Sequence, residues 1–389
     1  MTEKRRSLDI RHRRAVLLAW AIMLAAGRAS AMDHVTFHRH DRQIQVTGKV
    51  LVEAEDGGHL VLARDGVIWA VQPEEFVELR PDDKPFTGLS ADEMAARLRQ
   101  EMGPAFKVHQ TLHYLVCYNT SAAYAEWCGA LLERLHRAFT NDWRNKGFAI
   151  QSPSFPLVAL VFADRQSYAK HARAELGDAV GSIIGYYSLR TNRVTMVDLT
   201  GTNRVGTGRT GRTAAAINQL LARPQALRTV ATVVHEATHQ IAFNCGLQRR
   251  FADIPLWVSE GIAVYYETPD LKSKRSWRKI GAVNYARLNR FRGYLKHRSA
   301  DSLKTLIQDD LRFRDAGQAE DAYAEAWALN YFLLRKHQDS YVRYLKGLAA
   351  KQPLMHDAPA VRIREFQAAF GEDWANLEAK FLRYIRRIR

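Results

Sequence analysis

The sequence predicts an α+β fold, because strand patterns precede helical patterns along the chain and few parallel crossovers are indicated. Residues 42–72 contain three β-rich runs separated by Asp56-Gly57 and Asp65-Gly66, and Asp-Gly is a strong hairpin signal. Residues 105–197 alternate apolar strands with helices, and the remainder from Pro224 is mostly helical.

The composition is that of a globular protein. The chain has 389 residues, 47% of them hydrophobic and 10% aromatic, which is enough for two or three domains. Its three cysteines, Cys117, Cys128 and Cys245, exclude a disulfide framework and a four-cysteine zinc site. At most one bridge can form, and we expect buried free thiols.

Residues 1–31 have the pattern of a secretory signal peptide. A basic start precedes an apolar run of 13 residues, and Ala29-Ser30-Ala31 fits an A-x-A cleavage site. The run is too short for a membrane span, although an uncleaved anchor is the alternative interpretation. We therefore expect export to the bacterial periplasm or the outside of the cell, with no transmembrane span in the mature chain.

The mature chain is expected to be basic. Removing residues 1–31, which carry seven Lys/Arg and two Asp/Glu, lowers the formal net charge from +16 to +11. A basic surface favours anionic neighbours such as the cell-envelope surface or acidic peptides. No nucleic-acid-binding module is visible, so we do not expect nucleic acid as a partner.

The patterns divide the mature chain into four parts. Residues 32–85 are a small antiparallel β domain, and residues 86–104 are a linker helix that opens on a capping box. Residues 105–245 are the α+β half of the main domain, and residues 246–389 are its helical half. The first half should contain a strand, a helix, a second strand and a hairpin at 112–118, 121–147, 156–162 and 185–197.

The stretch VVHEATHQIAFNCG sets two histidines and a glutamate into a mostly apolar run. Apolar spacing predicts a helix over Pro224–Asn244, with Gly246 as its C-terminal cap. His235 and His239 then lie one turn apart on one face, where they can converge on a tetrahedral Zn²⁺. Glu236 lies roughly 100° around the helix, where it can reach a metal-bound water and act as general base.

A third zinc ligand is expected from the next apolar segment, residues 255–266. Pro255 suits a helix start, and Glu260 is the one carboxylate of the segment. A buried carboxylate without a basic neighbour needs a cation, which zinc would supply. The alternative interpretation is a pair of hydrogen-bonded core histidines, with Glu260 bonded to backbone amides.

These residues resemble the motifs of the gluzincin group of zinc metallopeptidases, which includes thermolysin and aminopeptidase N. The segment WVSEGIAVYYE is similar to the Trp-x-x-Glu-Gly-x-Ala form of the secreted bacterial peptidase-MA-like proteins, and the resemblance covers about residues 105–389. It implies a thermolysin-type domain with a mixed sheet, and zinc held by His235, His239 and Glu260. It also implies that Glu236 is the general base.

The segment YAEAWALNYFL, which begins at Tyr323, resembles the helix after the zinc site in aminopeptidase-N-type gluzincins. The leading tyrosine of that helix hydrogen-bonds the tetrahedral intermediate, which implies the same role for Tyr323. A phenol beside zinc can stabilise an oxyanion. The alternative is an ordinary tyrosine at the edge of the core, and Tyr186 and Tyr187 are lesser candidates.

Two features of the family are missing. Thermolysin has a carboxylate one turn after its glutamate ligand, where this chain has Val264, and Glu267 lies two turns on. No residue is therefore assigned to the orientation of the ligand histidines. The Gly-x-Met-Glu-Asn motif that reads a free amino terminus is absent from the sequence, so the resemblance implies no aminopeptidase activity.

Two further segments carry weaker signals. Gly206–Gly211 matches G-x-G-x-x-G, but the acidic partner of a nucleotide site would fall in the proposed zinc helix, so a mobile basic loop is expected. Residues 272–298 hold ten Lys/Arg and no Asp/Glu. A solvated helix face is the expected explanation, and a cleft for an acidic substrate is the alternative.

Together these patterns predict an exported zinc-dependent peptidase that hydrolyses peptide bonds through a metal-bound water. The alternative is a non-catalytic binding or scaffold protein of the cell envelope with a structural zinc site. Structural zinc usually has four protein ligands, and the sequence indicates three, which favours catalysis.

Overall fold

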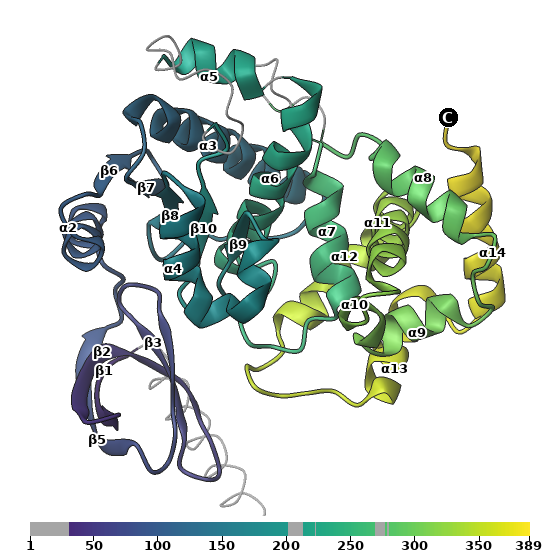
Figure 1. Ribbon diagram of the computed structural model, residues 1–389. Helices are drawn as coiled ribbons and strands as arrows, with labels where there is room; N and C mark the ends of the chain where they lie inside the picture. The colour runs from purple at the N-terminus through teal and green to yellow at the C-terminus, as the bar shows by residue number, and fades with distance from the viewer. Residues whose placement is uncertain (1–30, 201–212, 222, 269–276, 278–279) are drawn as a thin grey trace, which may run out of the picture. The chain divides into compact units, whose positions relative to one another are not determined.

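The computed structural model describes residues 31–389 except 201–212, 222, 269–276 and 278–279 (Figure 1). The chain divides into two compact units, residues 1–90 and 91–389. Residues 1–30 of the predicted signal peptide and the segment Gly206–Gly211 lie outside the described residues. In the part of the chain that is described, no helix is both long and apolar enough to cross a bilayer.

The first unit is a five-stranded antiparallel sheet in the order β4-β3-β2-β1-β5. Val35 and Phe37 of the first strand are fully buried and pack with Val46, Val61 and Val71 in a small core. The strands are β1 (Ala31–Arg39), β2 (Arg42–Glu53), β3 (His59–Ala63), β4 (Ile68–Val71) and β5 (Phe76–Pro85).

The predicted Asp-Gly turns join β2 to β3 and β3 to β4. Gly57 and Gly66 have φ angles of 90° and 83°, a left-handed conformation that glycine adopts without strain. β1 and β5 lie outside the three β-rich runs predicted at residues 42–72. Pro81 and Pro85 lie in β5, and they are tolerated there because β5 is an edge strand.

The helix assigned to a linker is α2 (Ala91–Met102), and it belongs to the second unit. It buries Met94, Ala95 and Leu98 and contacts two strands of that unit, β6 (Lys107–Gln110) and β7 (Tyr114–Tyr118). Because these side chains are buried, α2 is part of the packed domain and not a spacer.

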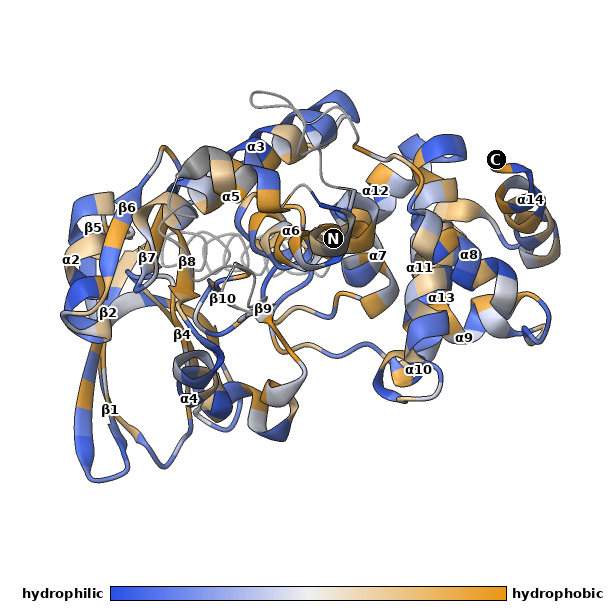
Figure 2. Ribbon diagram, turned by 45° about the horizontal axis from the view of Figure 1, so that its top comes forward, coloured by the Kyte–Doolittle hydropathy of each residue, from blue (hydrophilic) through white to orange (hydrophobic). Residues whose placement is uncertain are grey.

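The sheet of the second unit is mixed, in the order β6-β7-β8-β10-β9. The central strands β7, β8 (Leu157–Phe162) and β10 (Arg193–Val197) are parallel and entirely buried, and β8 carries the hydrophobic colour in Figure 2. β6 and β9 (Gly185–Tyr187) pair antiparallel at the two edges. The parallel crossovers run through α3 (Ala122–Asn145) and through α4 (Arg165–Leu176) with the 3₁₀ helix Gly177–Gly181.

The rest of the second unit is helical. The three cysteines are buried and free, as expected. The helices are α5 (Ala214–Leu221), α6 (Pro224–Asn244), α7 (Leu256–Tyr266), α8 (Tyr285–Tyr294), α9 (Ser302–Gln308), α10 (Leu311–Arg314), α11 (Ala319–Lys336), α12 (Gln338–Ala349), α13 (Pro359–Phe370) and α14 (Trp374–Arg387).

Helix α7 lies between α6 and α11 (Figure 1). A Cβ atom at Gly261 would lie 2.0 Å from Nδ2 of Asn330 on α11, so only glycine allows the two helices to approach this closely. The same Nδ2 atom donates a hydrogen bond to the carbonyl of Trp257 at 2.8 Å. These contacts hold α7 in place and thereby position Glu260, the residue before Gly261.

Candidate metal centre

The His-Glu-x-x-His motif lies in the middle of α6, with one side of the helix in the core and the other facing a pocket. The core side is formed by apolar residues that are at most 3% exposed: Val230, Val233, Val234, Ala237 and Ile241. The pocket has a volume of about 310 Å³, and His235, Glu236 and His239 all line it. The apolar spacing that predicted the helix therefore also separates its buried side from the side that faces the pocket.

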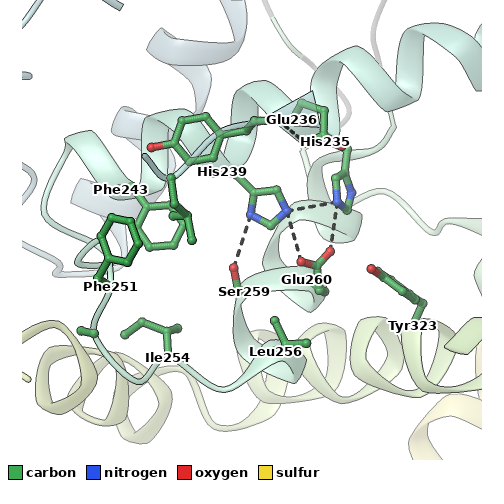
Figure 3. A pocket seen from close by; sticks show the side chains of 13 residues that line it. His235, Glu236, His239, Phe243, Phe251, Ile254, Leu256, Ser259, Glu260 and Tyr323 are labelled. Carbon is green, nitrogen blue, oxygen red and sulfur yellow. Dashed lines mark hydrogen bonds and ion pairs between the residues drawn. The ribbon is translucent and has the colours of Figure 1, made fainter. Parts of the chain in front are cut away.

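Three side chains bring possible metal ligands together in this pocket (Figure 3). Nε2 of His235 lies 3.1 Å from Nε2 of His239 and 3.1 Å from Oε2 of Glu260, and the His239 Nε2 lies 3.5 Å from Oε1 of Glu260. Ligands about 2.0–2.1 Å from a tetrahedral ion are about 3.3 Å apart, so the spacings fit one zinc ion. The described residues contain no other His, Cys, Asp or Glu group of this kind.

The electrostatics of the pocket favour a cation. Burial alone would raise the pKa of Glu260, but His239 and His235 outweigh it and hold that pKa well below its usual value. Burial alone would lower the pKa of His235, but hydrogen bonds with Glu260 and Glu267 raise it well above its usual value. Negative carboxylates thus stabilise positive charge at the point where the three ligand atoms meet.

His235 is oriented by a residue that the sequence analysis left unassigned. Its Nδ1 atom lies 2.8 Å from Oε1 of Glu267, the residue that caps the end of α7. When Nδ1 carries the ring proton and donates a hydrogen bond to this carboxylate, Nε2 keeps a lone pair for a metal. Residues seven apart lie on nearly the same helix face, so Glu267, two turns after Glu260, also faces α6.

His239 has a weaker partner of the same kind. Its Nδ1 atom lies 3.3 Å from Oγ of Ser259, and that hydroxyl donates to Oε1 of Gln248 at 3.4 Å. The contact leaves Nε2 of His239 facing Glu260. A serine inside an apolar helix carries no sequence signal for this role, which depends on how α7 packs against α6.

Glu236 lines the pocket beside the ligand atoms without being one of them. The backbone N–H of Tyr187 on the edge strand β9 donates to its Oε2 atom at 2.8 Å, which orients the carboxylate. Burial raises the pKa of Glu236, although His235 and His239 oppose the shift. A carboxylate with a raised pKa is better matched to accepting a proton near neutral pH than an ordinary one.

Tyr323 lies on α11, and its hydroxyl points toward Glu260 (Figure 3). Its ring packs edge-on against Phe313, with centroids 5.2 Å apart, and the guanidinium of Arg287 lies 5.5 Å from its centroid. Burial, together with the charges of Glu260 and Glu236, raises its pKa, so the phenol stays protonated and can donate a hydrogen bond.

The other two candidate tyrosines use their hydroxyls elsewhere. The hydroxyl of Tyr186 donates to Glu175 at 3.3 Å, and that of Tyr187 donates to Asn192 at 2.8 Å. Tyr187 reaches the site through its backbone N–H and its ring, which lines the pocket. Of the three tyrosines, only Tyr323 directs a hydroxyl toward the ligand atoms.

The arginine-rich run 272–298 is only partly described. Three of its arginines, Arg287, Arg290 and Arg298, lie 3.7, 2.6 and 2.7 Å from carboxylates of the same unit. Arg298 is buried, with a side chain 6% exposed, so it does not lie on a solvated face. At these three positions the charge is paired with carboxylates within the protein, whereas Lys272, Lys274, Arg275, Arg278 and Lys279 lie outside the described residues.

Comparison with known proteins finds one family model that matches part of the chain. The family model described as "Protein of unknown function (DUF1570)" matches residues 229–355. The match contains His235, Glu236, His239, Glu260 and Tyr323. No curated protein matches the chain. The matched segment is therefore the part of the chain that contains every predicted site residue, in a family whose description assigns no activity.

Proposed function

We propose that the protein is an exported zinc-dependent peptidase with one zinc ion per chain and a gluzincin-like domain. The proposal is carried by the convergence of His235, His239 and Glu260, whose ligand atoms lie within 4.8 Å of one another beside a separate carboxylate. Two imidazoles and one carboxylate are a donor set of catalytic zinc, which keeps one position open. Closed structural sites usually have four protein ligands, and the described residues supply three.

Zinc at this position would supply Lewis acidity to the peptide carbonyl and would lower the pKa of water. Glu236 accepts the proton of the attacking water and passes it to the leaving amine as the C–N bond breaks. Tyr323, protonated because of its raised pKa, donates a hydrogen bond to the oxyanion that forms on the carbonyl. Glu267 and Ser259 keep the two imidazoles in a fixed orientation.

Export is the part of the proposal that rests on residues 1–31. Cleavage after Ala31 would remove the predicted signal together with the first residue of β1, and the strand would begin at Met32. N-terminal sequencing of protein from the native host should start at Met32. An intact Met1 on protein recovered from the cytosol would contradict export.

Metal analysis tests the zinc site itself. The purified protein should contain about one zinc ion per chain. A chelator should remove the metal and peptide hydrolysis together, and added zinc should restore both. The His235→Ala/His239→Ala variant should lose the metal, whereas His356→Ala, at an exposed position, should retain it. Full zinc occupancy in the double variant would exclude the site.

A further inference from the structure

The pocket continues from the ligand atoms into an apolar recess on the side of His239 (Figure 3). Two walls of this recess come from α6 and from the β9–β10 hairpin, and a third comes from the segment between α6 and α7. We name it the aromatic recess, formed by Tyr187, Leu189, Phe243, Phe251 and Ile254. Among the described residues, the charged or titratable side chains that line the pocket are those of the metal centre and Glu236, together with the phenols of Tyr187 and Tyr323.

The wall formed by Tyr187 and Phe243 is held in place by ring stacking and by hydrogen bonds from outside the recess. The rings of Tyr187 and Phe243 stack with centroids 5.9 Å apart and an interplanar angle of 16°. The hydroxyl of Tyr187 donates to Oδ1 of Asn192, whose Nδ2 atom donates to Asn244 on α6, each at 2.8 Å. The hydroxyl is therefore satisfied outside the recess, and the ring presents an apolar face.

The segment between α6 and α7 contributes a residue in an unfavourable backbone conformation. Phe251 has a φ of 62°, a left-handed value that costs energy for any residue with a side chain. The conformation is held by a hydrogen bond from the N–H of Leu354 to the Phe251 carbonyl at 2.8 Å, and by the bridge between Ala252 and Pro353. Glycine would relieve the strain, and a large ring at a strained position beside a reactive centre indicates a functional wall.

We infer that the substrate peptide places a bulky apolar side chain, aromatic or long aliphatic, in the aromatic recess next to the bond that is cut. This inference rests on the proposed peptidase function and names its substrate class. Burial of a phenylalanine or leucine side chain against these walls gains free energy in proportion to the apolar area covered. An aspartate or lysine side chain would lose its hydration there without gaining a partner.

The test compares peptides that differ at one residue. Cleavage sites in a randomised peptide library are located by mass spectrometry. They identify the substrate position whose side chain enters the aromatic recess. Peptides with Phe, Leu, Ala, Asp or Lys at this position then give kcat/KM. The wild-type protein should prefer Phe and Leu over Ala by at least about 10-fold, with Asp and Lys lower still.

Phe251→Gly should lower the Phe-to-Ala ratio of kcat/KM by roughly 10-fold, because glycine keeps the left-handed backbone while the ring is lost. Leu354→Gly is the matched control. Leu354 also has a positive φ, of 65°, and shares the same backbone bridge, but it does not line the pocket. This control should keep the wild-type ratio.

Binding gives a readout that needs no turnover. N-acetyl-phenylalanine hydroxamate should bind the zinc-loaded protein at least about 10-fold more tightly than its glycine counterpart by calorimetry, and Phe251→Gly should reduce this difference. Unselective cleavage, or a Phe-to-Ala ratio that Phe251→Gly leaves unchanged, would overturn this inference alone. A protein without zinc that cleaves no peptide would overturn the proposed function and this inference with it.

Discussion

Nδ1 of His235 lies 2.8 Å from Oε1 of Glu267, a carboxylate two helical turns beyond Glu260. The carboxylate is itself approached by Arg287, at 3.7 Å, and by Asn284, whose Nδ2 atom donates to it at 3.4 Å. A ligand histidine that donates one ring N–H to a carboxylate is fixed in its tautomer and ring orientation. The imidazole is therefore oriented for a metal by the fold itself.

Glu267→Ala should lower zinc affinity by roughly 10- to 100-fold, because His235 loses the acceptor that orients it. Glu267→Gln should have a smaller effect, since the amide oxygen can still accept the Nδ1 proton. Competition with a chelator measures both. Glu320→Ala is the control, because Glu320 is 74% exposed and pairs with Arg290 instead of a ligand histidine. An unchanged zinc affinity in Glu267→Ala would show that this carboxylate does not support the site.

Tyr323→Phe should reduce peptide hydrolysis by roughly 10- to 1000-fold, because it removes one donor to the oxyanion. Zinc content should not change, since His235, His239 and Glu260 supply the three proposed ligand atoms. Tyr186→Phe is the comparison, because Tyr186 is the other candidate donor to the oxyanion. Its hydroxyl donates to Glu175 instead of facing the pocket, so this variant should lose less activity. Equal losses in kcat/KM for the two variants would contradict the assignment to Tyr323.

Gly261→Ala should lower the free energy of unfolding by about 1–3 kcal/mol, because the new methyl group overlaps Asn330 and the α7–α11 contact must open. Gly347→Ala is the matched control in another helix. A Cβ at Gly347 would meet no atom within 4 Å, so this variant should be neutral or up to about 1 kcal/mol more stable. Urea unfolding measures both, and equal stabilities would refute the close approach.

Asp253, two residues after Phe251, should contribute stability that depends on pH. Burial raises its pKa, but Arg362, whose Nη2 atom lies 2.6 Å from Oδ1, outweighs burial and lowers that pKa below its usual value. A carboxyl group with a lowered folded-state pKa stabilises the fold above its unfolded pKa, and this contribution is lost as the pH falls through the folded pKa.

Thermal unfolding between about pH 6 and about pH 3 measures this contribution. The wild-type protein should be more stable than Asp253→Asn at the higher pH, and the gap should narrow toward the lower pH. A gap of constant size over this range would mean that the Asp253 carboxylate contributes nothing through its charge.

The site residues whose positions follow from helix spacing could be predicted from the sequence. Those whose roles depend on how separate segments pack together could not. The spacing of His235 and His239 on a helix sets both imidazoles on one face, and a lone carboxylate in an apolar run makes Glu260 conspicuous. The role of Glu267 depends on the direction in which α7 crosses α6. The wall residue Phe251 lies in an irregular segment, where no periodic pattern exists to be read.

The same distinction applies to the fold. The central strands β7 and β8 are continuous apolar runs, and the long helices have regular apolar spacing, so both were predictable. β5 is an edge strand, and this position permits its two prolines and several charged residues. β6 is a four-residue edge strand with exposed ends. Edge strands carry a weak apolar pattern, since only part of their surface is buried.

Comparison of Glu236→Gln with the wild-type protein tests most directly whether this site hydrolyses peptides. The substitution keeps the shape of the side chain and its hydrogen bond from Tyr187, but removes the proton acceptor. Zinc content and melting temperature should barely change, while kcat/KM for a cleaved peptide should fall by about 100-fold or more. Full hydrolysis by zinc-loaded Glu236→Gln would contradict the mechanism.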